Sequence, residues 1–126
     1  MNYIIITNNP LVQSSYPPAS IICAKDYLDV LKQVRDHIHQ GFKLLSHPQA
    51  GSIKPYETPY RSVIISKEST ALDYKSLQYI ENAIERFETL STSMGFRDFN
   101  NDERILNDFQ VIDAGLIKTA VASFNM

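Results

Sequence analysis

Short continuous hydrophobic runs alternate along the chain with longer stretches whose apolar residues recur every three or four positions. The short runs span residues 3–7, 20–24, 42–46 and 61–66, and the first of them closes at the turn-forming Asn8. Continuous apolar runs bounded by turn residues are typical of strands buried on both faces of an α/β sheet. We therefore predict four strands in one sheet, most of them parallel.

Three longer stretches carry hydrophobic residues at helical spacing. The first, residues 26–40, is followed by Gly41, which suits a left-handed helix cap. A second helix is predicted at about 72–91, with Asp73 or Thr70 as its cap. A third runs from about residue 101 to the C-terminal end, about 30 Å at ~1.5 Å per residue, with a possible bend at Gly115. The apolar stripes comprise Leu28, Leu31, Val34 and Ile38 in the first helix, Leu77, Ile80, Ala83, Ile84 and Phe87 in the second, and Ile105, Phe109, Ile112, Leu116, Ala120 and Val121 in the third.

The order of these elements predicts an α/β fold, with residues 1–126 forming a single domain. We expect a single open sheet of about four mostly parallel strands with packed helices, in a Rossmann-like three-layer arrangement, plus the long C-terminal helix. Residues 11–18 are predicted as a loop, because Pro17 and Pro18 disfavour a helix there. The strand order stays open, as does the direction of the fourth strand, because no helix is predicted between the third and fourth strands.

The charge balance excludes one class of partner. Twelve basic and 14 acidic residues give a formal net charge of -2, whereas binding nucleic acid through its phosphates requires an excess of Lys and Arg. No apolar stretch approaches the ~18 residues that span a membrane, and the first nine residues lack the basic region of a signal peptide. We expect a cytoplasmic protein that binds neither nucleic acid nor membrane.

Motifs for metals and cofactors are missing as well. Cys23 is the single cysteine, which excludes an internal disulfide and a cysteine-based zinc site, and its apolar surroundings predict burial. His37 and His39 are two residues apart on a predicted helix, so they point to different faces and cannot chelate one metal. The phosphate-binding patterns Gly-x-x-x-x-Gly-Lys and Gly-x-Gly and the nucleophile pattern Gly-x-Ser-x-Gly do not occur. We predict no metal and no cofactor.

The most informative segment is the proline-broken stretch 47–61, which follows the third predicted strand. Long loops without secondary structure are uncommon in compact domains and are often functional. In open α/β sheets, ligands bind beyond the carboxyl ends of the strands, and Asn8 and Asn9 follow the end of the first strand. If the first and third strands are parallel neighbours, these residues share one rim. The predicted ligand-binding residues are Asn8, Asn9, His47, Gly51, Ser52, Lys54, Thr58 and Arg61.

This rim has the chemistry to hold a small anion. Lys54 and Arg61 supply positive charge, and Ser52 supplies a hydroxyl beside a flexible backbone. His47 can exchange a proton near neutral pH. The alternative interpretation is a proline-stiffened surface loop in which Glu57 pairs with Lys54.

Several runs along the chain resemble the GrdX family. They are residues 5–12, 27–31, 34–36, 38–39, 43–48, 51–55 and 57–60, and the resemblance covers about the first two thirds of the sequence. The family comprises small bacterial proteins associated with glycine reductase gene clusters of amino-acid-fermenting anaerobes. The resemblance implies a cytoplasmic, bacterial protein with an accessory role near amino-acid reduction. It assigns no catalytic residue, and it identifies the stretch 47–60 as a family signature.

Three hypotheses about function remain. The first is an accessory protein that binds a small anionic metabolite at the rim. The second is an interaction module whose C-terminal helix pairs with a copy of itself, forming a homo-oligomer, or with another subunit. The contact would use an apolar stripe comprising Leu116, Ile117, Ala120, Val121 and Phe124. The third, least favoured, is a small enzyme with His47 as general acid or base, for which Ser52 is the only nearby nucleophile.

Overall fold

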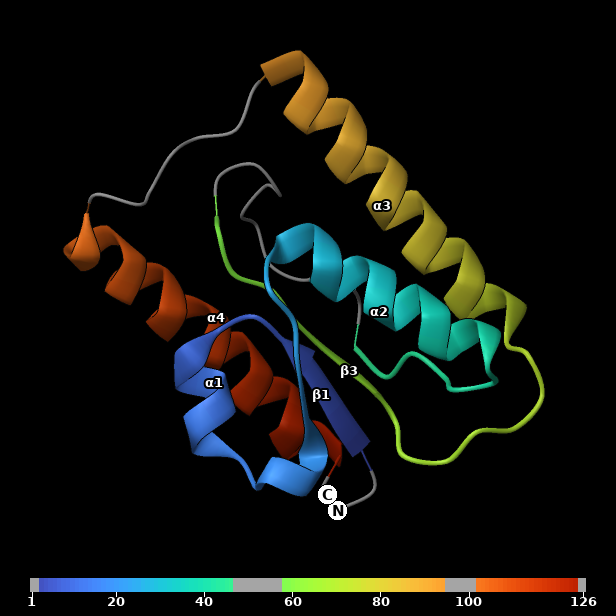
Figure 1. The fold of residues 1–126 in the computed structure, drawn as a ribbon. Coiled ribbons are helices and arrows are strands. Elements are labelled where there is room, and N and C mark those ends of the chain that lie inside the picture. Colours follow the sequence, from blue (N-terminus) through green and yellow to red (C-terminus); the bar gives the residue numbers. More distant parts are fainter. Residues whose placement is uncertain (1–2, 47–57, 95–101, 125–126) are drawn as a thin grey trace.

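The computed structural model describes residues 3–46, 58–94 and 102–124, with the side chains of 90–94 and 124 left out. Figure 1 shows its helices and strands in chain order. They are β1 (Tyr3–Thr7), α1 (Pro10–Ser15), the short 3-10 helix η1 (Pro18–Ser20), β2 (Ile21–Cys23), α2 (Tyr27–His39), β3 (Ser62–Ser66), α3 (Tyr74–Met94) and α4 (Glu103–Phe124). The three predicted long helices are confirmed within a few residues, and α4 continues through Gly115.

The sheet differs from the prediction in both size and direction. Within residues 3–46, 58–94 and 102–124, it has three strands in the order β2-β1-β3. The central strand β1 is parallel to β2, with Ile5 opposite Ile21, and antiparallel to β3, with Ile5 opposite Ile64. The expectation of four mostly parallel strands is therefore wrong.

The predicted strand 42–46 forms only an isolated bridge, between Leu44 and Ile65. The amide of Leu44 donates to the Ser76 hydroxyl and that of Lys43 to the Ser66 hydroxyl, so these amides are not available for a regular ladder. The amide of Leu45 does reach the Ile64 carbonyl, at 2.8 Å. The segment thus lies along β3 as an irregular edge.

The direction of β3 follows from where this strand begins. Ser62, its first residue, lies opposite Thr7, the last residue of β1. Leu44 is antiparallel to Ile65, so the chain has already run along the sheet towards the carboxyl end of β1 before β3 starts there. A strand entered at that end needs no crossover and must run antiparallel to β1.

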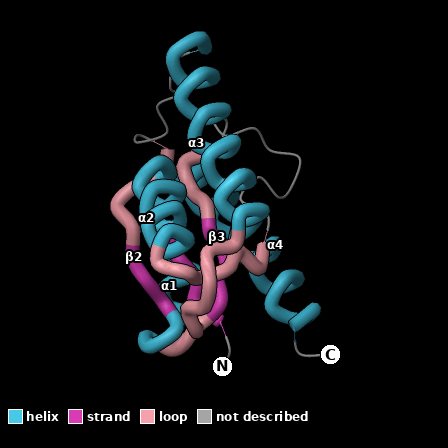
Figure 2. The backbone as a smooth tube through the Cα atoms, turned by 90° about the vertical axis from the view of Figure 1, so that its right-hand side faces the viewer, coloured by secondary structure: helices cyan, strands magenta, loops and turns pink. Residues whose placement is uncertain are grey.

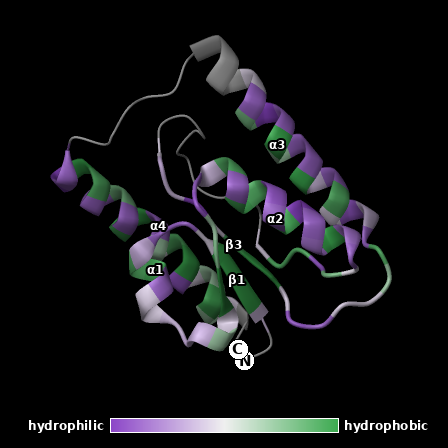
Figure 3. Cartoon of the chain, viewed as in Figure 1, coloured by the Kyte–Doolittle hydropathy of each residue, from purple (hydrophilic) through white to green (hydrophobic). Residues whose placement is uncertain are grey.

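Helices cover both faces of the sheet, which confirms the predicted three layers. On one face, Ile6, Val63 and Ile65 pack with the apolar sides of α2 and α3. On the other face, Ile5 and Ile64 pack with α1 and α4, in a smaller cluster that contains Tyr3, Val12 and Ile117. Successive strand residues alternate between the two clusters, as the period of two requires. Figures 1 and 2 show α2 and α3 on one side of the sheet and α4 on the other, and Figure 3 shows the apolar strands between them.

Two further expectations are corrected. Residues 10–15 form α1 instead of a loop, because the Asn9 side chain accepts a hydrogen bond from the Leu11 amide and Pro10 occupies the first turn. Cys23 is exposed instead of buried, because it ends β2 at the edge of the sheet. Within the described residues, no helix combines the length and the apolarity that a membrane span requires.

Helix caps follow the sequence closely. Asp26 caps α2 through the Asp29 amide, and the Asp73 carboxylate accepts from the amide and hydroxyl of Ser76 in the first turn of α3. These hydrogen bonds hold the pKa of Asp73 below the usual aspartate value. Gly41 has φ of 98°, as predicted for a left-handed cap.

Candidate functional site

Four of the eight predicted site residues lie in the part of the chain that the structure describes. Asn8, Asn9, Thr58 and Arg61 lie together where β1 ends and β3 begins. The other four, His47, Gly51, Ser52 and Lys54, lie outside the described residues.

Asn8 ties the approach to β3 to the end of β1. Its Nδ2 donates to the Pro59 carbonyl at 2.8 Å, and its Oδ1 accepts from the Arg61 amide at 2.9 Å. Both polar groups of the side chain are therefore engaged with backbone. Asn8 positions Arg61.

Asn9 is fully buried, and its side chain has two structural roles. Its Oδ1 caps α1, and its Nδ2 donates to the Gln110 carbonyl and to the Asp113 carboxylate of α4, each at 3.0 Å. The residue thereby fixes α4 against the carboxyl end of β1.

Asp113 is the centre of a buried polar cluster that also contains Thr7, Asn9 and Ser62. The Asp113 side chain is only 5 % exposed. Besides Asn9, it accepts from the Ser62 amide at 3.1 Å and from the Ser62 hydroxyl at 2.6 Å. A carboxylate with three donors is well satisfied for a buried anion.

The direction of the hydrogen bonds in this cluster can be deduced. Because the Ser62 hydroxyl donates its one proton to Asp113, it must accept from the Thr7 hydroxyl, 2.7 Å away. Thr7 in turn accepts from the Asn9 amide at 2.9 Å. The chain of donors therefore runs from Asn9 through Thr7 and Ser62 to Asp113, and each bond polarises the next.

Arg61 is a buried cation beside this cluster, at 4 % exposure. Its Nε donates to the Tyr27 hydroxyl at 3.1 Å, and its guanidinium carbon lies 5.4 Å from the centre of the Tyr27 ring. Burial raises the pKa of Tyr27, although Arg61 opposes the shift. Tyr27 is therefore a neutral acceptor and a π-face for the guanidinium. Its ring also stacks on Phe87, with centroids 4.9 Å apart.

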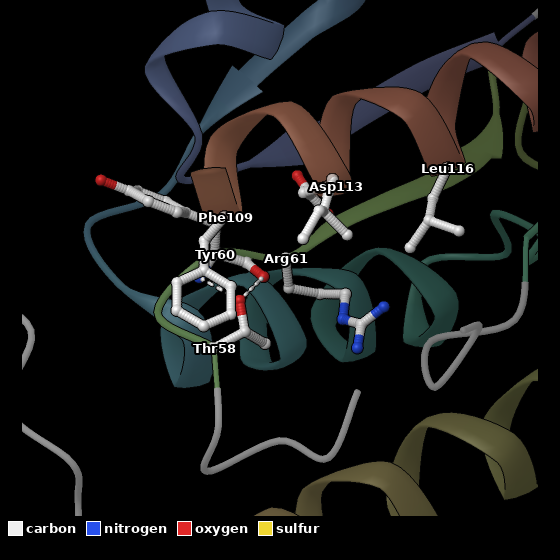
Figure 4. A pocket seen from close by; sticks show the side chains of 7 residues that line it. Thr58, Tyr60, Arg61, Phe109, Asp113 and Leu116 are labelled. Carbon is white, nitrogen blue, oxygen red and sulfur yellow. Dashed lines mark hydrogen bonds between the residues drawn. The ribbon is translucent and has the colours of Figure 1, made fainter. Parts of the chain in front are cut away.

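Arg61 and Asp113 line a small pocket between α4 and the start of β3, which we call the Arg61 pocket. Figure 4 shows Thr58, Tyr60 and Phe109 towards one end, Leu116 towards the other and Arg61 between them. Its volume is about 10 Å³, room for one water molecule. The lining residues are Thr58, Tyr60, Arg61, Phe109, Ile112, Asp113 and Leu116.

Two side chains around the pocket are held in place by neighbours. Gln110 Nε2 donates to the Tyr60 hydroxyl at 3.0 Å, which links α4 to the segment before β3. Thr58 is buried, and its hydroxyl lies 3.3 Å from the Tyr60 amide, which donates to it. The lining combines the Arg61 guanidinium with an apolar wall and with the Asp113 carboxylate, whose oxygens already accept from Asn9 and Ser62. The guanidinium is the group of this lining that could hold a small anion.

Sequence reasoning missed Asp113, Ser62 and Tyr27. The sequence did contain a signal for Asp113. Its carboxylate directly follows Ile112 and lies between positions of the apolar stripe of an amphipathic helix. Its partners could not be predicted, since Asn9 is the cap of α1 and Ser62 is the first residue of β3, both far away in the sequence. Among the described residues, no three His, Cys, Asp or Glu side chains gather where they could hold a metal ion.

Comparison with known proteins gives one match. Residues 4–122 match the family model described as GrdX-like protein. Neither the curated proteins nor the solved structures contain a significant match to the chain. The family assignment therefore rests on a model that spans almost the whole chain, including α4.

Proposed function

This chain belongs to the GrdX-like protein family, and we propose that it is a non-catalytic accessory protein that binds a small anionic metabolite at the Arg61 pocket. The proposal extends the predicted rim, made by the turn at Asn8 and Asn9 and by the stretch 47–61, to residues of α4. The observation that carries it is the burial of Arg61, at 4 % exposure, in the lining of a pocket.

A buried guanidinium is an unusual lining for a structural void. Arginine keeps its charge at all physiological pH values, and burying that charge is costly unless it meets anionic or hydrogen-bonding groups. Guanidinium groups recognise carboxylates and phosphates through two parallel hydrogen bonds. Thr58 adds a hydroxyl on the same wall. Both groups suit the anionic end of a ligand.

The size of the pocket limits the ligand and the manner of binding. A space of about 10 Å³ holds one water, so any metabolite must displace that water and move a wall. Tyr60 is the best candidate to move, because it is half-buried and is held from its hydroxyl by a single side chain, Gln110. We therefore propose that the ligand is no larger than an amino acid or acetyl phosphate, and that it displaces the Tyr60 side chain.

The proposed role is accessory to amino-acid reduction in an anaerobic bacterium. This role is supported by the membership of the chain in the GrdX-like family and by the association with glycine reductase gene clusters that the resemblance implies. A carboxylate such as glycine, or a phosphorylated product such as acetyl phosphate, matches both the charge of Arg61 and the small size of the pocket.

The test is thermal unfolding of the purified protein with glycine, sarcosine, betaine, acetyl phosphate, phosphate and acetate. A ligand present at about 100 times its dissociation constant stabilises the folded state by ~2.7 kcal/mol, which raises the melting temperature by several degrees for a protein of this size. Isothermal titration then gives the affinity of any compound that shifts the transition.

Two arginine variants make the test specific. Arg61→Met removes the buried cation, whereas Arg35→Met removes a more exposed one that pairs with Asp36 at 3.5 Å. Each is compared with its own ligand-free transition, because Arg61→Met also lowers the starting stability. We expect Arg35→Met to keep the shift and Arg61→Met to lose it. A shift that survives in Arg61→Met would refute the site, and no shift with any compound would refute the proposed function.

A further inference from the structure

The solvent-facing side of α4 carries an apolar surface beside a groove. Val111 is 62 % exposed, which is high for a large aliphatic side chain. One turn later, a Cβ added to Gly115 would meet no atom within 4 Å. A groove of about 220 Å³ lies alongside, between α1 and α4. Leu11, Ser15, Tyr16, Val111, Ala114, Gly115 and Lys118 line this groove.

Two opposite charges flank this apolar surface. Asp108 and Lys118 are both exposed, and the sequence separations between Asp108, Val111, Gly115 and Lys118 are three, four and three residues. Such spacing places all four on one face of a helix. In the part of the chain that the structure describes, no ion pair involves Asp108 or Lys118.

Along the axis of α4, the four positions are arranged symmetrically about the height of Asp113. The Asp113 side chain itself points to the opposite side of the helix, into the core. Val111 and Gly115 lie two residues before and after that level, and Asp108 and Lys118 lie five residues before and after it. In two helices related by a two-fold axis at this level, each residue before the centre faces the matching residue after the centre of the partner. Asp108 then faces Lys118, and Val111 faces the space beside Gly115.

We propose that two copies of this chain associate through antiparallel α4 helices, with the two-fold axis at the level of Asp113. The contact contains two Asp108–Lys118 ion pairs, about 7–8 Å along the helix from the axis at ~1.5 Å per residue. Between them, each Val111 fills the space left by the partner's missing side chain at 115. A parallel pairing would place like charges together, so the charge pattern favours the antiparallel one.

This contact differs from the one predicted from the sequence and is independent of the proposed anion site. Ile117, the centre of the predicted stripe, is 3 % exposed and packs in the core with Ile5 and Ile64, and Ala120 and Val121 are half-buried against the same cluster. Three residues of the predicted stripe, Ile117, Ala120 and Val121, therefore face the sheet, whereas Leu116 is 36 % exposed. The proposed dimer uses the other side of the helix.

The test is the oligomeric state of charge variants, measured by sedimentation velocity over a range of concentrations to about 100 µM. Asp108→Lys and Lys118→Asp each create two like-charged pairs across the contact, so each should raise the dimer dissociation constant at least about tenfold. The double variant Asp108→Lys/Lys118→Asp restores opposite charges and should dimerise like the wild type. Glu85→Lys, at an exposed carboxylate of α3, is the control for the change in net charge.

Gly115 provides a second, uncharged test. A Cβ added at Gly115 would meet no atom within 4 Å, and an open groove lies beside it. Gly115→Leu should therefore fold normally, which circular dichroism checks, while its side chain occupies the place of the partner's Val111 and weakens the dimer. A wild-type protein that stays monomeric at about 100 µM would overturn the proposal. So would a double charge variant as weak as either single one, or a Gly115→Leu variant that dimerises like the wild type.

Discussion

Replacing Asp113 tests whether one buried carboxylate joins α4 to the sheet. Its oxygens accept from Asn9 Nδ2, from the Ser62 amide and from the Ser62 hydroxyl. In Asp113→Ala, the Ser62 amide loses the acceptor that the carboxylate supplies, and Asn9 Nδ2 keeps only the Gln110 carbonyl. The Ser62 and Thr7 hydroxyls keep one hydrogen bond between them, so one of their two protons loses its acceptor as well.

The size of the effect follows from the donors left without acceptors. A buried donor that loses its partner costs about 1–3 kcal/mol, and hydrogen bonds to a charged group lie at the upper end of the usual range. With three donors affected, we expect Asp113→Ala to lower the free energy of unfolding by at least about 3 kcal/mol. Asp113→Asn keeps one oxygen, which can serve the Ser62 amide, and should lose about 1–3 kcal/mol. The loss in the alanine variant is a large fraction of the total stability of a domain, which is about 5–15 kcal/mol.

Urea unfolding followed by circular dichroism measures both variants. Glu85→Ala, at an exposed carboxylate of α3, is the control and should stay within about 0.5 kcal/mol of the wild type. An Asp113→Ala variant that loses less than about 1 kcal/mol, with an unchanged dependence on urea, would refute the reasoning. It would mean that water or a rearranged Ser62 serves the donors equally well.

Three further predictions concern the other side of the sheet. Gly41→Ala should unfold more easily by about 2 kcal/mol or more in urea, because φ is 98° and the added Cβ would lie 2.1 Å from the Thr70 carbonyl oxygen; an unchanged midpoint would contradict this. Tyr27→Phe should cost about 1–3 kcal/mol by leaving Arg61 Nε without its acceptor, whereas a loss equal to that of an exposed tyrosine would show that the bond adds nothing. The stability that Asp73 contributes requires its ionised form, so it is present above the unfolded pKa of about 4 and is lost as the pH falls through the lowered folded pKa. The difference in unfolding free energy between wild type and Asp73→Asn should therefore vanish in acid. A difference that persists in acid would refute the pH linkage.

The sequence predicted elements well where one local pattern determines them. The runs 3–7 and 61–66 are strands because both of their faces are covered, and the stripes of α2 and α3 face the core as their spacing requires. In α4 the predicted stripe is only partly correct, because Ile112 and Leu116 are exposed and Ile117 is the buried hydrophobic residue. The stretch 42–46 also looks like a strand, because Phe42 and Leu44 pack against the core. Its backbone bonds to serine hydroxyls instead of a full ladder, and those hydroxyls belong to residues 66 and 76.

Direction and pairing were beyond local patterns. The sequence of residues 61–66 does not determine which end of β1 they lie beside, so it could not predict the antiparallel direction of β3. The helix α1 was within reach, because Asn9 followed by Pro10 is a strong signal for a helix start. The prolines at 17 and 18 only end that helical region.

The candidate site was predicted by position more than by partner. Asn8, Asn9, Thr58 and Arg61 do gather at the carboxyl end of β1. The side chains of the two asparagines bond to the protein itself, which a sequence cannot show. Asp113 lies 104 residues from Asn9 and 51 from Ser62, so its role appears only when the fold brings these distant residues together.

The position of α4 in the chain has a consequence for how the protein is made. One face of the sheet, with Ile5 and Ile64, is completed by Ile117 of α4, and α4 is synthesised after every other element described. During translation, the layer formed with α2 and α3 can assemble while α1 alone covers the opposite face. The nascent chain therefore exposes an apolar sheet surface until α4 leaves the ribosome, and chaperones that bind such surfaces would meet this protein at that stage.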